Sequence, residues 1–135
     1  MLKTFALLLA LAPFAIAAPF AAEIEAPYVA TSKGGLYKAG LTPESEPVAI
    51  NAMQSWTLTL TGADGVPVEG ASVTIDGGMP MHGHGLPSAP QVTESLGDGR
   101  YLVEGVKFNM AGEWVINLAI EAPAGADTVT FQLPL

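Results

Sequence analysis

An alternation of apolar and polar residues with a period of two constrains the fold of this chain more than any other feature. The alternation is clearest in residues 55–61, where a tryptophan and two leucines fall on one face and three threonines on the other. Successive side chains of a β-strand point to opposite faces, so this pattern is typical of a half-buried strand. We therefore expect an all-β protein.

Further short runs of this kind alternate with turn signals along the chain. They cover residues 36–38, 47–50, 71–76, 91–95, 100–106, 114–120 and 129–133, the first two as edge strands. The segment Gly97-Asp98-Gly99 favours a hairpin, because Asp-Gly accepts positive φ. About seven short strands without a convincing helix predict an immunoglobulin-like antiparallel β-sandwich. The chain has no cysteine, so burial alone must hold the core together.

The first 17 residues have the pattern of a signal peptide. One lysine precedes an apolar run that ends in Ala15-Ile16-Ala17, the small-x-small pattern of a cleavage site. A retained membrane anchor is the alternative, but Pro13 interrupts a run that is short against the roughly 20 residues of a spanning helix. We expect a signal peptide at 1–17, a flexible lead-in at 18–33, a sandwich domain at 34–135 and a periplasmic protein without a stable anchor.

Charge and composition limit the partners. Cleavage after Ala17 removes Lys3 and no acidic residue, which leaves a net charge near −9. Such a balance argues against nucleic acid and anionic membranes as partners. Without cysteine, the soft ligands available for metal binding are methionine sulfur and histidine nitrogen.

The order of the expected strands brings the methionines and histidines together. Strands that run alternately up and down place Met53, the loop at 77–90 and the segment at 107–112 at one end of the domain. All the methionines and histidines of the mature chain lie in these three segments.

The central loop reads Gly78-Met79-Pro80-Met81-His82-Gly83-His84-Gly85. Thioether and imidazole together suit a soft ion such as Cu(I), since thioether is a poor ligand for Zn²⁺ or Mg²⁺. An extended Met79–His84 segment would span roughly 17 Å, so the loop must curl, which its glycines permit. The expected copper ligands are Met79, Met81, His82, His84 and Met110. A subset of one histidine and one loop methionine, completed by Met110, is the expected arrangement.

Other interpretations remain open for the same residues. The glycines are also what a tight turn needs, methionines beside a turn often pack beneath it, and the histidines are then merely solvated. Met53, next to Trp56, fits a gap-filling core residue better than a ligand. A catalytic pair of Ser88 and His84 would lack an orienting carboxylate and an oxyanion hole. Glu94 and Asp98 could form an acid/base pair, but they flank a hairpin turn, where polar residues are expected for solvation and turn geometry. We therefore expect no enzymatic activity.

Residues 35–135 resemble the YtkA-like or FixH-like family of exported bacterial proteins, some of which are labelled auxin-binding proteins. The resemblance lies in residues 77–87, 97–101 and 108–114. It implies a small β-sandwich outside the cytoplasmic membrane and, for some members, copper handling or assembly of copper-containing oxidases. The family's Met-His loop corresponds to Met79, Met81, His82 and His84, and its Phe-x-Met-x-Gly-x-Trp motif supplies Met110.

Two functions follow as hypotheses. The first is a periplasmic Cu(I) chaperone, carrier or buffer whose partner is a copper-receiving protein. Its copper binding should weaken below about pH 6 to 6.5, because imidazole must be neutral to bind a metal. The alternative is a metal-free interaction or assembly module that docks on a membrane complex such as a respiratory oxidase.

Overall fold

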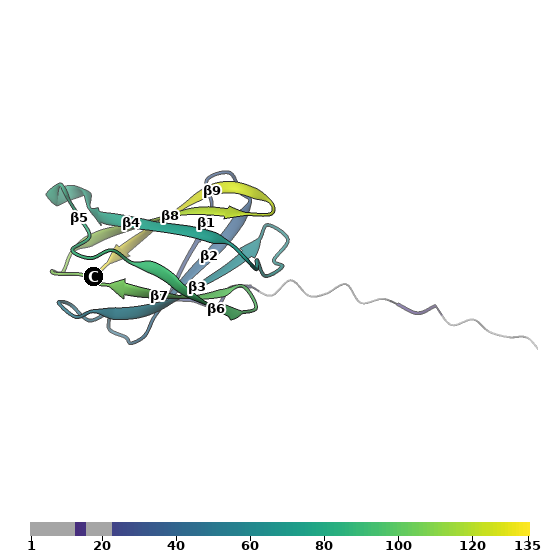
Figure 1. The fold of residues 1–135 in the computed structure, drawn as a ribbon, viewed down its shortest axis with the longest axis horizontal. Coiled ribbons are helices and arrows are strands. Elements are labelled where there is room, and N and C mark those ends of the chain that lie inside the picture. Colours follow the sequence, from purple (N-terminus) through teal and green to yellow (C-terminus); the bar gives the residue numbers. More distant parts are fainter. Residues whose placement is uncertain (1–12, 16–22) are drawn as a thin grey trace, which may run out of the picture.

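The structure, a computed structural model, describes residues 13–15 and 23–135 of the chain. Two antiparallel sheets face each other and form the expected β-sandwich (Figure 1). The expected signal peptide lies outside the described residues, apart from residues 13–15. Within the described ranges, no helix is long and apolar enough to cross a membrane.

One sheet has five strands and the other four. The five-stranded sheet has the order β1-β2-β3-β7-β6 and consists of β1 (Tyr28–Thr31), β2 (Tyr37–Pro43), β3 (Gln54–Gly62), β7 (Arg100–Val106) and β6 (Gln91–Gly97). The four-stranded sheet has the order β5-β4-β8-β9 and consists of β5 (His84–Gly85), β4 (Ser72–Met79), β8 (Glu113–Ala122) and β9 (Gly125–Pro134). A short 3₁₀ helix, η1 (Pro80–His82), joins β4 to β5.

Three details differ from the expectation for the strands. Part of the expected lead-in is strand β1, which pairs with β2 while Tyr28 and Ala30 pack against the core. The strand expected at 36–38 is therefore not an edge strand, because β2 lies between β1 and β3. The edge strand expected at 47–50 is wrong, because these residues form no strand. Pro47 has no amide hydrogen for a ladder, and the chain then turns at Asn51, whose φ is 64°.

The hairpin between β6 and β7 is confirmed. Asp98 and Gly99 have φ values of 53° and 70° between the paired residues Gly97 and Arg100. Two successive residues with positive φ match the right-handed twist of the flanking strands, which explains the Asp-Gly pair.

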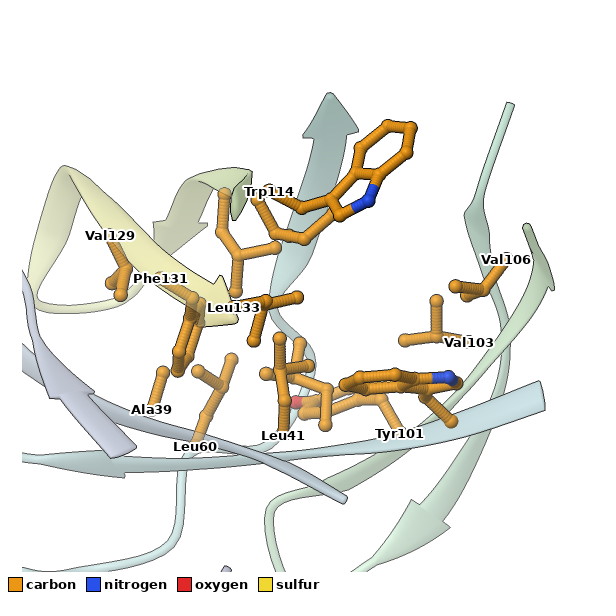
Figure 2. Packing of buried hydrophobic residues seen from close by; sticks show 14 of the residues in the cluster. Ala39, Leu41, Leu60, Tyr101, Val103, Val106, Trp114, Val129, Phe131 and Leu133 are labelled. Atoms are coloured by element: carbon orange, nitrogen blue, oxygen red, sulfur yellow. The ribbon is translucent and has the colours of Figure 1, made fainter. Parts of the chain in front are cut away.

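The core consists of the inward rows of both sheets. Figure 2 shows part of this cluster, with Trp114 beyond Leu133 at one edge of it. Trp56 and Trp114 are both buried, and Phe108 lies against each of them, with ring centroids 5.9 and 5.2 Å away. Burial therefore holds the cysteine-free core together, as expected, and both tryptophans take part in it.

Asp127 on β9 ties the two sheets together. Its carboxylate accepts hydrogen bonds from the backbone amides of Gly34 and Leu36, in the turn between β1 and β2. Hydrogen bonds from the Ser32 side chain and from these amides lower the pKa of Asp127 to about 2. The ionised carboxylate therefore fastens the turn to β9.

Candidate metal-binding site

Three loops meet at one end of the sandwich, at the left in Figure 1 where β5 lies. They are the β2–β3 loop with Met53, the β4–β5 connection around η1, and the β7–β8 loop with Met110. The amide of Asn51 donates to the Phe108 carbonyl at 2.7 Å, which joins the first loop to the third. Gly112 exchanges two backbone hydrogen bonds with the C-terminal Leu135. The expected gathering of these segments is confirmed.

The β4–β5 connection curls tightly. Pro80–His82 forms one 3₁₀ turn, and Gly83 follows with φ 66° and donates its amide to the Pro80 carbonyl at 3.3 Å. A left-handed residue at this point reverses the chain at no steric cost when it is glycine. The expected role of Gly83 is confirmed, whereas Gly85 lies in β5 without a positive φ. A side chain at Gly78 would collide with the carbonyl oxygen of His84, so the glycine lets β5 lie close to β4.

The two methionines of this motif lie in opposite environments. Met79 is the last residue of β4, is only 1% exposed and belongs to the core. Its methyl carbon lies 2.5 Å from the position that a Cβ at Gly112 would take, so it packs directly under the β7–β8 loop. Met81 in η1 is 86% exposed. Only Met81 offers its sulfur to solvent from this loop.

Both histidines are exposed and lie close together. The ring centroids of His82 and His84 are 6.0 Å apart, with the ring planes inclined by 33°. Nδ1 of His84 lies 2.9 Å from the Gly85 carbonyl oxygen. A carbonyl oxygen can only accept, so Nδ1 carries the proton of the neutral ring and Nε2 keeps a free lone pair. This contact therefore favours the tautomer in which Nε2 is available to a metal.

Sequence reasoning missed the part that Trp114 takes at this end. The rings of His84 and Trp114 are in edge contact, with centroids 5.6 Å apart and planes inclined by 68°. The indole Nε1 donates to the Met110 carbonyl at 3.0 Å. The pairing of Met79 with His84 across β4 and β5 turns His84 toward the core face, where Trp114 lies. The signal in the sequence was the Phe-x-Met-x-Gly-x-Trp motif, which places Trp114 four residues after Met110.

Met110 and Met53 lie on the flanking loops. Met110 is 37% exposed and Met53 is 62% exposed. Both sulfurs are therefore at the same end of the domain as the histidines, while each side chain belongs to a different loop. Met53 is more exposed than a gap-filling core residue would be.

Two surface hollows lie at opposite ends of the sandwich. A shallow hollow of about 310 Å³ lies beside the loop, and Asp76, Pro80, His84 and Asn117 are among the residues that line it. A larger hollow of about 590 Å³ lies at the other end of the sandwich and includes no methionine or histidine. Among the described residues, no three histidine or acidic side chains are grouped as metal ligands. The soft donors at this end are its methionines and its two histidines.

One comparison with known proteins gives a match. The YtkA-like family matches residues 31–119, which include the β4–β5 connection, Met110 and Trp114. No curated protein and no solved structure gives a significant match. The matched segment covers most of the sandwich, and the chain therefore belongs to the YtkA-like family.

Proposed function

We propose that this protein is a periplasmic copper-binding protein that carries, delivers or buffers Cu(I). The observation that supports this proposal most is the grouping of Met81, His82 and His84 on one exposed turn. Thioether and imidazole are the neutral ligands that Cu(I) accepts, and hard ions such as Mg²⁺ prefer oxygen. Copper is here the cargo of the protein.

The exposure of the donors bears on how copper would exchange. Met81 and the two histidines are exposed on the β4–β5 connection, and Met110 lies on the neighbouring loop. A metal held by such a shallow set remains accessible to the ligands of a receiving protein. We therefore favour transfer or buffering of copper over a permanently buried centre.

The proposed ligand set is narrower than the motif. Met81, His82 and His84 form its centre, with Met110 as a fourth candidate. Met79 is excluded from the proposed set because its side chain fills the core and would have to leave it to reach a metal.

A titration tests this proposal. The mature protein, titrated with Cu(I) under anaerobic conditions against a competing chelator, should bind one equivalent. The triple variant Met81→Leu, His82→Asn, His84→Asn should lose it, and the control Met53→Leu should keep it. Equal binding by the triple variant and the wild type would exclude the loop as the copper site.

A second candidate function rests on the apolar surface of the same end. Four large apolar residues lie exposed on its three loops: Ile50, Met53, Met81 and Met110. Exposed apolar groups that gather in one place often mark a protein interface. A metal-free module that docks on a membrane complex would use this surface without the histidines. Replacement of His82 and His84 by asparagine would then leave complex assembly intact, whereas Met53→Glu together with Met81→Glu would abolish it.

A further inference from the structure

We propose that Trp114 is the positioning residue that joins the β4–β5 and β7–β8 loops into a single binding site. This inference rests on the proposed copper function, but its first test does not need copper. Trp114 is fully buried, so it acts on a bound metal through the residues that it holds and not by direct contact.

The first contact of Trp114 fixes the Met110 loop. Its indole Nε1 donates to the Met110 carbonyl at 3.0 Å, four residues back along the chain. The loop is also fastened at its two ends, by Asn51 to the Phe108 carbonyl and by Gly112 to Leu135. The indole bond lies between these two points. It therefore sets the direction in which the Met110 side chain leaves the backbone.

The second contact fixes His84. The His84 ring packs against the indole at 5.6 Å between centroids, in an inclined geometry favoured by aromatic pairs. The Nδ1 contact to the Gly85 carbonyl, at 2.9 Å, is a second contact of the same ring. With these two contacts the ring orientation, and hence the direction of the free Nε2, is determined before a metal arrives.

One rigid side chain thus touches both donor-bearing loops. Trp114 belongs to β8 and is packed against Phe108, at 5.2 Å between ring centroids, so it moves only with the core. A site whose ligands are held in place before binding loses less conformational entropy when the metal binds. Trp114 would therefore raise copper affinity without being a ligand.

The apo protein provides the first test, by NMR on wild type and on Trp114→Phe. Phenylalanine keeps a buried ring but removes the indole donor. We expect the imidazole resonances of His84 to shift and the backbone order at Met110 to decrease. The control Trp56→Phe also removes a buried indole donor, the one that bonds Gln54 at 3.1 Å, and should leave both signals unchanged. Unchanged signals in Trp114→Phe would overturn the inference, whatever copper does.

Copper affinity provides the second test. Loss of one positioning hydrogen bond should weaken Cu(I) binding about three- to tenfold in Trp114→Phe. Trp56→Phe should stay within about twofold of wild type. An equal loss in both variants would show a general effect of core packing and would contradict a positioning role. Absence of copper binding in the wild type would instead refute the proposed function and leave the apo test to decide on Trp114.

Fluorescence covers the case in which Trp114→Phe does not fold. In the Trp56→Phe variant, Trp114 is the single remaining tryptophan and keeps its native position. Cu(I) should quench its emission in proportion to the bound fraction, because His84 lies against the indole. His84→Asn should alter the emission of the apo protein. An emission that responds neither to copper bound at one equivalent nor to His84→Asn would overturn the inference.

Discussion

Residues 79–84 form one short motif with a strand half, Met79, and a turn half, which runs from Met81 to His84. The two halves lie in sharply different environments. Met79 ends β4 and is 1% exposed, whereas Met81, two residues later in η1, is 86% exposed. The sequence Met-Pro-Met presents the two thioethers as equivalent soft ligands, but the end of the strand separates them. One methionine belongs to the core and the other is available to solvent. A ligand motif that crosses the end of a strand thus contains residues with two different tasks.

Stability should separate the two methionines most strongly. Met79→Ala removes a buried side chain and leaves a cavity, so we expect a loss of about 2 to 5 kcal/mol in the free energy of unfolding. Met81→Ala should change it by less than about 0.5 kcal/mol. Denaturant titration followed by tryptophan fluorescence measures both. Similar losses in the two variants would contradict the division of the motif.

Substitution of Gly112, which packs against Met79, should have the next largest effect on the free energy of unfolding. Gly112 has φ 141°, and a Cβ there would meet the Met79 methyl carbon. We expect Gly112→Ala to cost about 1 to 3 kcal/mol. Met79→Ala should relieve the steric part of this cost in the double variant, so the two changes should not be additive. Strict additivity in a double-mutant cycle would show that a side chain at position 112 is not in steric conflict with Met79.

Gly83 provides a comparison in the turn half. It also has a positive φ, 66°, but a Cβ there would have no atom within 4 Å. Gly83→Ala should therefore cost only the backbone strain, about 1 kcal/mol. Its cost should be unaffected by Met79→Ala, because nothing connects the two positions sterically. Urea unfolding of the two single variants and the double variant tests this difference.

The smallest effect is expected far from the motif, at Asp127. Its folded-state pKa of about 2 lies below the ordinary value of 3.8, so its hydrogen bonds stabilise the fold fully above about pH 4. This contribution is lost as the pH falls from about 4 toward 2. Asp127→Asn should lower stability near neutral pH and should make acid unfolding less dependent on pH in that interval. Circular dichroism during acid titration measures it, and identical profiles for the two proteins would exclude the contribution.

The fold was predictable because its signals are local. The alternation around Trp56 and the Asp98-Gly99 turn each depend on neighbouring residues, and both are confirmed. Strand β1 was missed because its pairing with β2 depends on packing beneath Tyr28 and not on a pattern of its own. Strand order also placed the three donor-bearing loops at one end correctly.

The details of the candidate site were less predictable. Sequence spacing could not show that Met79 is buried, since that depends on where β4 ends and on the space left by Gly112. Nor could it show that Trp114 touches His84, because the contact forms across two strands. Such features depend on tertiary packing, which a single sequence does not display.

The central claim is that copper binds to the turn half of the motif and leaves the strand half in the core. NMR of the protein with ¹³C-labelled methionine methyl groups, titrated anaerobically with Cu(I), tests it most directly. At one equivalent, the Met81 methyl resonance should move while that of Met79 stays in place. A shift of Met79, or the absence of any shift at Met81, would contradict this account.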